Sequence, residues 1–177
     1  MSELKLIKPS KNYEDQVMNY KNAFFENGDS FDGCSGLEEC NTYAEWLDFE
    51  NRLKRKYGDS YVPSSVFLAV RQEDDKVVGI IDCRHYLSEF LANYGGHIGY
   101  SVLPSERRKG YAKEMLKLAL DEYKKMNVEK VLLTCDKENE GSRRTIIRNG
   151  GKLEKEIVDD VGLSKSGVIQ KYWIVVE

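Results

Sequence analysis

The spacing of apolar residues changes at Pro63, and this change restricts the fold more than any other feature of the sequence. Over residues 12–27 and 42–57 apolar side chains recur every three or four positions, which predicts two amphipathic helices. Thr42 and Glu45 predict a capping box at the start of the second helix. Beyond Pro63 most apolar residues fall in short runs bounded by turn residues, which predicts strands. Together with one strand before Pro63, the predicted strands cover residues 4–8, 66–70, 77–87, 97–103, 129–135, 152–161 and 168–176.

Two further helices are predicted between the later strands. One, over residues 109–126, carries a regular apolar face, and the other, over residues 139–149, ends at the pair Gly150 and Gly151. The element order is therefore β-α-α-β-β-β-α-β-α-β-β. Hairpin spacing followed by strand–helix–strand units predicts a single α/β domain over residues 1–177, with a mixed sheet and helices packed on it.

Charge and hydropathy exclude several classes of protein. The chain has 27 Lys and Arg residues against 30 Asp and Glu residues, a net charge of −3, whereas domains that wrap nucleic acid usually carry a large basic excess. No apolar run reaches the roughly 18–20 residues needed to span a membrane. The first ten residues lack the apolar segment of a secretory signal. We therefore expect a cytoplasmic protein without nucleic-acid or membrane partners.

The cysteines and histidines do not predict a metal site. The four cysteines contain no C-x-x-C pair, and only two histidines are present, so no structural zinc site is expected. Cys83 and Cys135 lie inside predicted strands and are expected to be small core residues. The sequence therefore predicts no bound metal.

The turn before the helix at residues 109–126 is the segment that most clearly predicts a ligand. Four basic side chains gather there: Arg107, Arg108, Lys109 and Lys113. Cations at a helix N-terminus oppose the helix dipole, so local stability does not favour them. A bound phosphate would remove that conflict, because unpaired N–H groups and the dipole both attract an anion. A solvated basic loop is the alternative.

The order of residues in this turn narrows the class of phosphate site. Neither G-x-x-x-x-G-K-S/T nor G-x-G-x-x-G is present, which argues against a P-loop or a Rossmann dinucleotide site. Instead, Arg107-x-x-Gly110-x-Ala112 follows a strand, and this resembles the pyrophosphate-binding motif Q/R-x-x-G-x-G/A of the GNAT N-acetyltransferase superfamily. Asn139 and Ser142 resemble its second cofactor segment. The chain looks like a bacterial branch of predicted acetyltransferases in this superfamily.

The resemblance implies an acyl-CoA N-acyltransferase-like fold, α/β (α+β), with a mixed central sheet of about six to seven strands and helices on both faces. In that fold the fourth and fifth strands, here 97–103 and 129–135, splay apart and take the pantetheine arm of acetyl-CoA between them. A backbone amide near Val102 would polarise the thioester carbonyl. Asn139 would bind the pantetheine side, although a helix N-cap explains the residue equally well. The residues implied in cofactor binding are Val102, Leu103, Arg107, Arg108, Lys109, Gly110, Tyr111, Ala112, Asn139, Ser142 and Arg143.

Acetyl transfer to an amine requires removal of the ammonium proton. His97 opens a strand where some relatives place a base, and an ordinary pKa of about 6.5 suits that task. His85 is a second candidate, and Tyr100 is either a core aromatic or a residue of the site. The superfamily often has a tyrosine acid seven residues after Asn139, where this chain has Ile146. Because a thiol of pKa about 8.5 departs with little help near neutral pH, this difference weakens the expected activity without excluding it.

The first two helices and their connection flank the acceptor in the resembled fold. Residues 22–51 contain eight acidic residues and neither Lys nor Arg, so they either attract a cationic amine or form an ordinary solvated face. Loop 28–36 is a candidate lid. The resemblance implies an acetyl-CoA-dependent N-acetyltransferase that acts directly on a small-molecule or peptide amine in a ternary complex. The alternatives are a non-catalytic acyl-CoA-binding module and a generic phosphate binder, and a homodimer is one option because these folds often pair.

Overall fold

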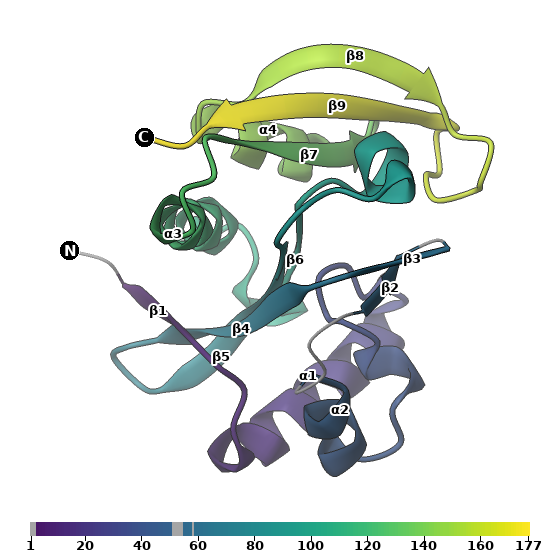
Figure 1. Cartoon of the computed structure of the whole chain (residues 1–177). Coiled ribbons are helices and arrows are strands. Elements are labelled where there is room, and N and C mark those ends of the chain that lie inside the picture. Colours follow the sequence, from purple (N-terminus) through teal and green to yellow (C-terminus); the bar gives the residue numbers. More distant parts are fainter. Residues whose placement is uncertain (1–2, 51–54, 58) are drawn as a thin grey trace.

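The strands form two main sheets, which Figure 1 shows one above the other in the computed structural model. The structure describes residues 3–50, 55–57 and 59–177. The first sheet has the order β1-β4-β5-β6, with β1 (Leu4–Ile7), β4 (Ser64–Arg71), β5 (Lys76–Arg84) and β6 (Ile98–Val102). The second has the order β7-β9-β8, with β7 (Lys130–Asp136), β9 (Val168–Val175) and β8 (Lys152–Val158). Neighbouring strands within both sheets are antiparallel.

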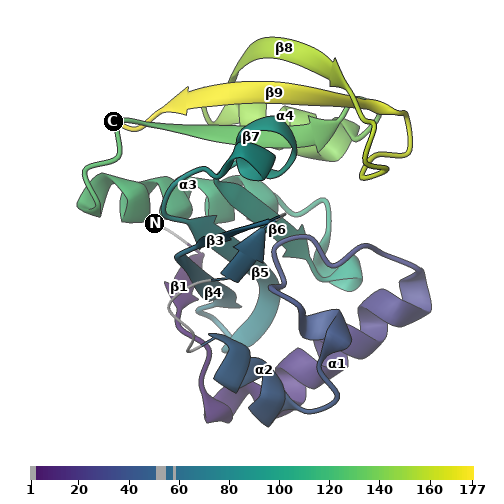
Figure 2. The same ribbon diagram turned by 45° about the vertical axis from the view of Figure 1, so that its right-hand side comes forward.

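Helices cover both faces of the first sheet, as predicted. In both views α3 lies between the two sheets, whereas α1 and α2 lie on the opposite side of the first sheet (Figure 1 and Figure 2). The helices are α1 (Glu14–Asn27), α2 (Tyr43–Glu50), α3 (Tyr111–Lys125) and α4 (Glu140–Arg148), with short helical turns at Lys11–Tyr13, Leu37–Glu39, Leu91–Gly95 and Pro104–Glu106. Across the described ranges, no helix is both long and apolar enough to span a bilayer.

Two apolar cores hold these layers together. The first lies between the sheets, where Met115 of α3 belongs to one buried cluster with Ile81 and Leu133. The second lies beneath α1 and α2, where Trp46 belongs to a buried cluster with Leu68. Since β4 and β5 contribute residues to both cores, these strands are buried on both faces. Such burial explains why they are continuous apolar runs in the sequence.

The two sheets meet at the start of β6. His97 N–H donates to the Leu132 carbonyl (2.7 Å), and Leu132 N–H donates to His97 Nδ1 (2.9 Å). Beyond this junction β6 and β7 belong to different sheets. The predicted α/β fold class is thus confirmed: the expected six to seven strands are present as four plus three, and the division falls between the two strands predicted to splay apart. The sheet differs from the predicted mixed sheet, because its bonded strands are antiparallel throughout and are divided between two sheets.

The helix predicted over residues 42–57 begins as expected but is wrong at its C-terminal end. The capping box is present, since Glu45 N–H donates to Thr42 Oγ1 (3.2 Å) and Thr42 N–H donates to Glu45 Oε2 (3.3 Å). Residues 51–54 lie outside the described part of the chain. Residues 55–57 form strand β2 (Arg55–Tyr57), which pairs with β3 (Ser60–Val62), a strand that the sequence did not predict. Pairing with β3 therefore overrides the helical spacing at residues 55–57.

Candidate functional site

The turn between β6 and α3 presents its backbone as an anion-binding loop would. Arg108 (φ 62°) and Gly110 (φ 89°) are both left-handed, and no side chain caps the helix. Glu114 N–H donates to the Gly110 carbonyl (3.2 Å), which is the first hydrogen bond of α3. The three N–H groups of residues 111–113 therefore precede the helical ladder and point out of the helix end. A Cβ at Gly110 would meet nothing within 4 Å, so backbone and ligand can approach closely here.

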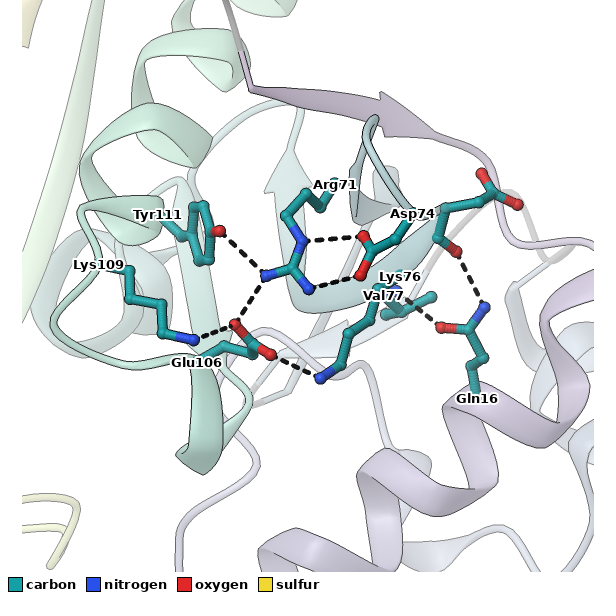
Figure 3. A network of polar contacts seen from close by, with 9 residues as sticks. Gln16, Arg71, Asp74, Lys76, Val77, Glu106, Lys109 and Tyr111 are labelled. Carbon is teal, nitrogen blue, oxygen red and sulfur yellow. Dashed lines mark hydrogen bonds and ion pairs between the residues drawn. The ribbon is translucent and has the colours of Figure 1, made fainter.

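A buried carboxylate anchors this turn to the first sheet (Figure 3). Glu106, whose side chain is only 4% exposed, accepts from Arg71 Nη1 (2.9 Å), Lys76 Nζ (2.5 Å) and Lys109 Nζ (2.8 Å). Arg71 also donates to the Tyr111 hydroxyl (3.1 Å), the first residue of α3. Hydrogen bonds from Lys109 and Lys76, with a further one from Arg71, lower the pKa of Glu106 to about 2. The network thus fixes both ends of the turn at residues 107–112, the phosphate turn, because Glu106 precedes it and Tyr111 lies near its end.

Two of the four predicted phosphate cations are committed to acidic partners. Lys109 binds Glu106, as described above. Arg107 forms a bidentate pair with Asp29 through Nη1 (3.3 Å) and Nη2 (2.6 Å), and its Nε donates to the Val102 carbonyl (3.0 Å). Arg108 and Lys113 are exposed and make no ion pair with the residues that the structure describes. Arg108 and Lys113 are therefore the side chains of this turn that are best placed to receive a phosphate.

The start of α4 supplies a second group of polar atoms near the split, the place where β6 of the first sheet and β7 of the second sheet part. Asn139 caps the helix, because its Oδ1 accepts from Ser142 N–H (3.0 Å). The Ser142 hydroxyl and the Tyr100 hydroxyl of β6 lie 2.9 Å apart. Arg143 Nε is buried and has no hydrogen-bond partner among the described residues. A buried guanidinium nitrogen without a partner is costly, so an anionic or carbonyl ligand beside α4 would satisfy an unmet donor.

The backbone of β6 also faces the split. Leu103 N–H donates to the Val78 carbonyl (2.8 Å) of β5, and bonded residues alternate along an antiparallel strand. Tyr100 and Val102 therefore turn their N–H groups away from β5, toward the edge where β6 and β7 part. This orientation suits the predicted role of the Val102 amide. With the open helix end and the unpaired Arg143 nitrogen, these donors fit the phosphates and amide arm of acetyl-CoA.

The environment of His97 argues against the predicted base at this position. The residue is 6% exposed, and its Nδ1 accepts from the Leu132 backbone, so the neutral ring carries its proton on Nε2. Burial, followed by the nearby Arg84 guanidinium, lowers the pKa of His97 to about 4. Its carbonyl accepts from the Tyr123 hydroxyl (2.9 Å). His97 is therefore placed as the neutral junction between the two sheets.

Neither His85 nor position 146 supplies a catalytic group in this structure. His85 Nε2 lies 2.9 Å from Ser65 Oγ, and its N–H donates to the Pro63 carbonyl, so it is tied to the outer part of the first sheet. Ile146 is fully buried in the core between the sheets. Among the described residues no group of three or more His, Cys, Asp or Glu side chains is arranged to hold a metal ion.

Asp82 is a candidate site residue that the sequence did not single out. It lies on β5 opposite Gly99 and is 1% exposed. Its Oδ2 accepts from the Tyr57 hydroxyl (2.5 Å) and Arg84 Nε (3.1 Å), while Oδ1 has no partner among the described residues. A lone carboxylate inside the apolar run V-V-G-I-I-D-C is the signal that would have found it.

The fold described above resembles that of known proteins. Residues 31–150 match the family model described as the acetyltransferase (GNAT) family, and no curated protein sequence matches the chain. The structure is similar to that of a microcin C7 self-immunity acetyltransferase solved with acetyl-CoA and AMP, at 16% identity and TM-score 0.71 over 99% of this chain and 94% of that one. It is also similar to a Salmonella typhimurium acetyltransferase that modifies the N-terminal serine of a 50S ribosomal subunit protein (14%, 0.69, 100% and 97%). A third similar structure is the spermidine/spermine N-acetyltransferase of Vibrio cholerae (15%, 0.67, 99% and 95%).

Proposed function

The chain belongs to the acetyltransferase (GNAT) family, and we propose that it is a cytoplasmic enzyme that transfers the acetyl group of acetyl-CoA directly to a primary amine in a ternary complex. The observation that carries this proposal is the uncapped, left-handed turn at Arg108 and Gly110, placed at the end of the strand where the sheet divides. Open N–H groups at a helix start bind phosphate. When bound, acetyl-CoA supplies the activated thioester.

The acceptor side supports a cationic amine. Gly33 packs against β6 so closely that a Cβ there would lie 2.3 Å from the Gly99 carbonyl oxygen, so the acidic loop after α1 covers this face of the strand. Burial raises the pKa of the Cys34 thiol, and the carboxylates of Glu38, Asp32 and Asp82 add to that rise. Asp32 and Glu38 are exposed and belong to residues 22–51, which carry eight acidic residues and neither Lys nor Arg, so this surface favours an ammonium group. Asp82 Oδ1, which lacks a partner among the described residues, is our candidate contact for it.

The test has a binding step and a turnover step. Calorimetry measures acetyl-CoA binding, and release of free thiol measures transfer to spermidine, to a peptide with a free N-terminus and to taurine, an amine whose sulfonate cancels its positive charge. We expect acetyl-CoA to bind and spermidine to react faster than taurine. The Arg108→Ala/Lys113→Ala double variant should weaken acetyl-CoA binding, while the Lys124→Ala/Lys125→Ala double variant, which removes two exposed cations from the other end of α3, is the matched control. Absence of acetyl-CoA binding by the unmodified protein would refute the proposal.

A second candidate is a non-catalytic acyl-CoA-binding module. Two observations favour it: a buried Ile146 stands where an acid would be expected, and His97 has its acceptor nitrogen engaged. This module would bind acetyl-CoA tightly yet release no thiol with any of the amines. Turnover with one amine would exclude it.

A further inference from the structure

Tyr100 links β6 of the first sheet to α4, the helix that follows β7 of the second sheet. Its side chain extends from β6 on the side of Ile98 and Val102, and it packs against the core between the sheets. Its hydroxyl reaches across to Ser142 of α4, at a distance of 2.9 Å between the oxygens. A hydroxyl that bridges the strand and the helix on either side of the split therefore lies beside both sets of donors that fit acetyl-CoA.

The hydroxyl of Tyr100 stays protonated in this position. Burial raises the pKa of Tyr100 to about 12, with hydrogen bonds from Ser142 and Thr145 acting in the opposite direction. Near neutral pH the group is thus a neutral phenol, which can donate a proton or a hydrogen bond. Ser142 is half-buried rather than sealed off, so its hydroxyl can pass a proton between the phenol and solvent.

Position 146, in the next turn of α4, offers no such donor. Ile146 is fully buried, and Gly151 packs so closely on it that a Cβ there would lie 2.4 Å from Ile146 Cγ2. Position 146 therefore belongs to the core and contributes no polar atom. A departing thiolate of ordinary pKa about 8.5 still gains from a proton near neutral pH.

We propose that Tyr100 is the proton donor to the sulfur that departs during acetyl transfer, with Ser142 as the residue that positions its hydroxyl. This inference rests on the proposed function. As the amine nitrogen bonds to the carbonyl carbon, the carbon–sulfur bond breaks, and its electron pair remains on sulfur. Tyr100 Oη gives its proton to that sulfur. Because the pKa of Tyr100, about 12, lies above that of the thiol, about 8.5, no free phenolate accumulates. Ser142 Oγ passes a proton from solvent to Tyr100 Oη in the same step.

The test removes the Tyr100 hydroxyl and, as a matched control, the hydroxyl of Tyr20, a residue of α1 that contacts the other face of β6. Tyr20 also bonds a serine of β6, with its hydroxyl 2.9 Å from Ser101 Oγ, and it has no part in the proposed chemistry. Tyr100→Phe and Tyr20→Phe are compared by kcat, by acetyl-CoA Kd and by the pKa of the thiol of bound coenzyme A, followed by thiolate absorbance. The last measurement needs no turnover.

We expect Tyr100→Phe to lower kcat by about 100-fold, the lower range for a lost acid, with little change in acetyl-CoA Kd. We also expect the pKa of the bound thiol to rise by about one unit, because the thiolate loses a hydrogen bond. Ser142→Ala should show a smaller change of the same sign in both quantities. Tyr20→Phe should leave both unchanged, and thermal unfolding verifies that every variant is folded.

The outcomes separate the two proposals. If the unmodified protein binds no acetyl-CoA, the proposed function fails and this inference fails with it. If acetyl-CoA binds and amines react, but Tyr100→Phe matches Tyr20→Phe in kcat and in thiol pKa, Tyr100 is not the donor and the proposed function stands. If coenzyme A binds without turnover, an unchanged thiol pKa in Tyr100→Phe is enough to overturn the assignment.

Discussion

Replacing Glu106 by Gln tests whether one buried carboxylate holds the phosphate turn. The side chain accepts from Lys109, Lys76 and Arg71 and is 4% exposed. Its pKa falls from 4.5 to about 2 in the folded protein, which at about 1.4 kcal/mol per unit corresponds to about 3 kcal/mol. Because the side chains of Lys76 and Lys109 are 38% and 50% exposed, solvent screens part of this energy. We therefore expect Glu106→Gln to lower the free energy of unfolding by about 2 kcal/mol near neutral pH, a fall in Tm of about 5 °C.

The pH dependence gives the sharper part of this test. The folded-state pKa of Glu106 is depressed, so its contribution to stability is fully present above pH 4.5 and is lost as the pH falls toward about 2. Urea unfolding followed by tryptophan fluorescence, repeated through this window, should show the difference between the two proteins shrinking. Glu122→Gln removes an exposed pair with Lys125 (2.5 Å) and is the matched control, with an expected loss below about 0.5 kcal/mol. Equal losses for the two variants, or a difference that persists to the lowest pH, would refute the reasoning.

Three further predictions concern the turn, the acceptor loop and the junction. Gly110→Ala and Gly150→Ala each place a Cβ in open space, at φ 89° and 88°, so each should cost about 1 kcal/mol of stability. Only Gly110→Ala should weaken acetyl-CoA binding, by about tenfold in calorimetry. Equal affinities of the two variants would contradict the assignment of the turn before α3 as a phosphate site. Gly33→Ala should lower the free energy of unfolding, measured in urea, by about 2 kcal/mol more than Gly28→Ala does. The reason is that a Cβ at position 33 clashes with backbone, whereas a Cβ at position 28 meets nothing within 4 Å. Similar losses for the two variants would show that the loop does not pack on β6. An NMR titration should give His97 a pKa of about 4. Because the unfolded chain takes up the proton first, His97 lowers the free energy of unfolding as the pH falls from about 6.5 to about 4. A titration midpoint above pH 6 would make His97 a candidate base again.

The elements whose signals are local were predicted from the sequence. The apolar face of α3, the capping box at Thr42 and the glycine stop after α4 depend on residues a few positions apart, and each is in place. The strand over residues 55–57 was missed because its partner strand, not its own spacing, decides its conformation.

In the site, the sequence predicted where the backbone turns but not where the side chains go. The motif placed the phosphate turn at residues 107–112, and the left-handed Gly110 agrees with it. The partner of Arg107, however, is Asp29, which lies 78 positions away, and no local pattern announces such a pair. The sequence predicts His97 as a candidate base, and it gives no local sign of the Leu132 amide that occupies Nδ1, because that amide lies 35 positions further along the chain.

The division of the sheet also bears on how the chain folds as it is synthesised. All four strands of the first sheet come from residues 4–102, whereas the second sheet comes entirely from residues 130–175. During translation the first sheet can thus complete its hydrogen bonds, and bury one face beneath α1 and α2, before the second has left the ribosome. Its other face, with Phe67 and Ile81, has no cover until α3 emerges. This intermediate exposes an apolar sheet, so the nascent chain is most in need of chaperone protection between the emergence of β6 from the ribosome and the emergence of α3.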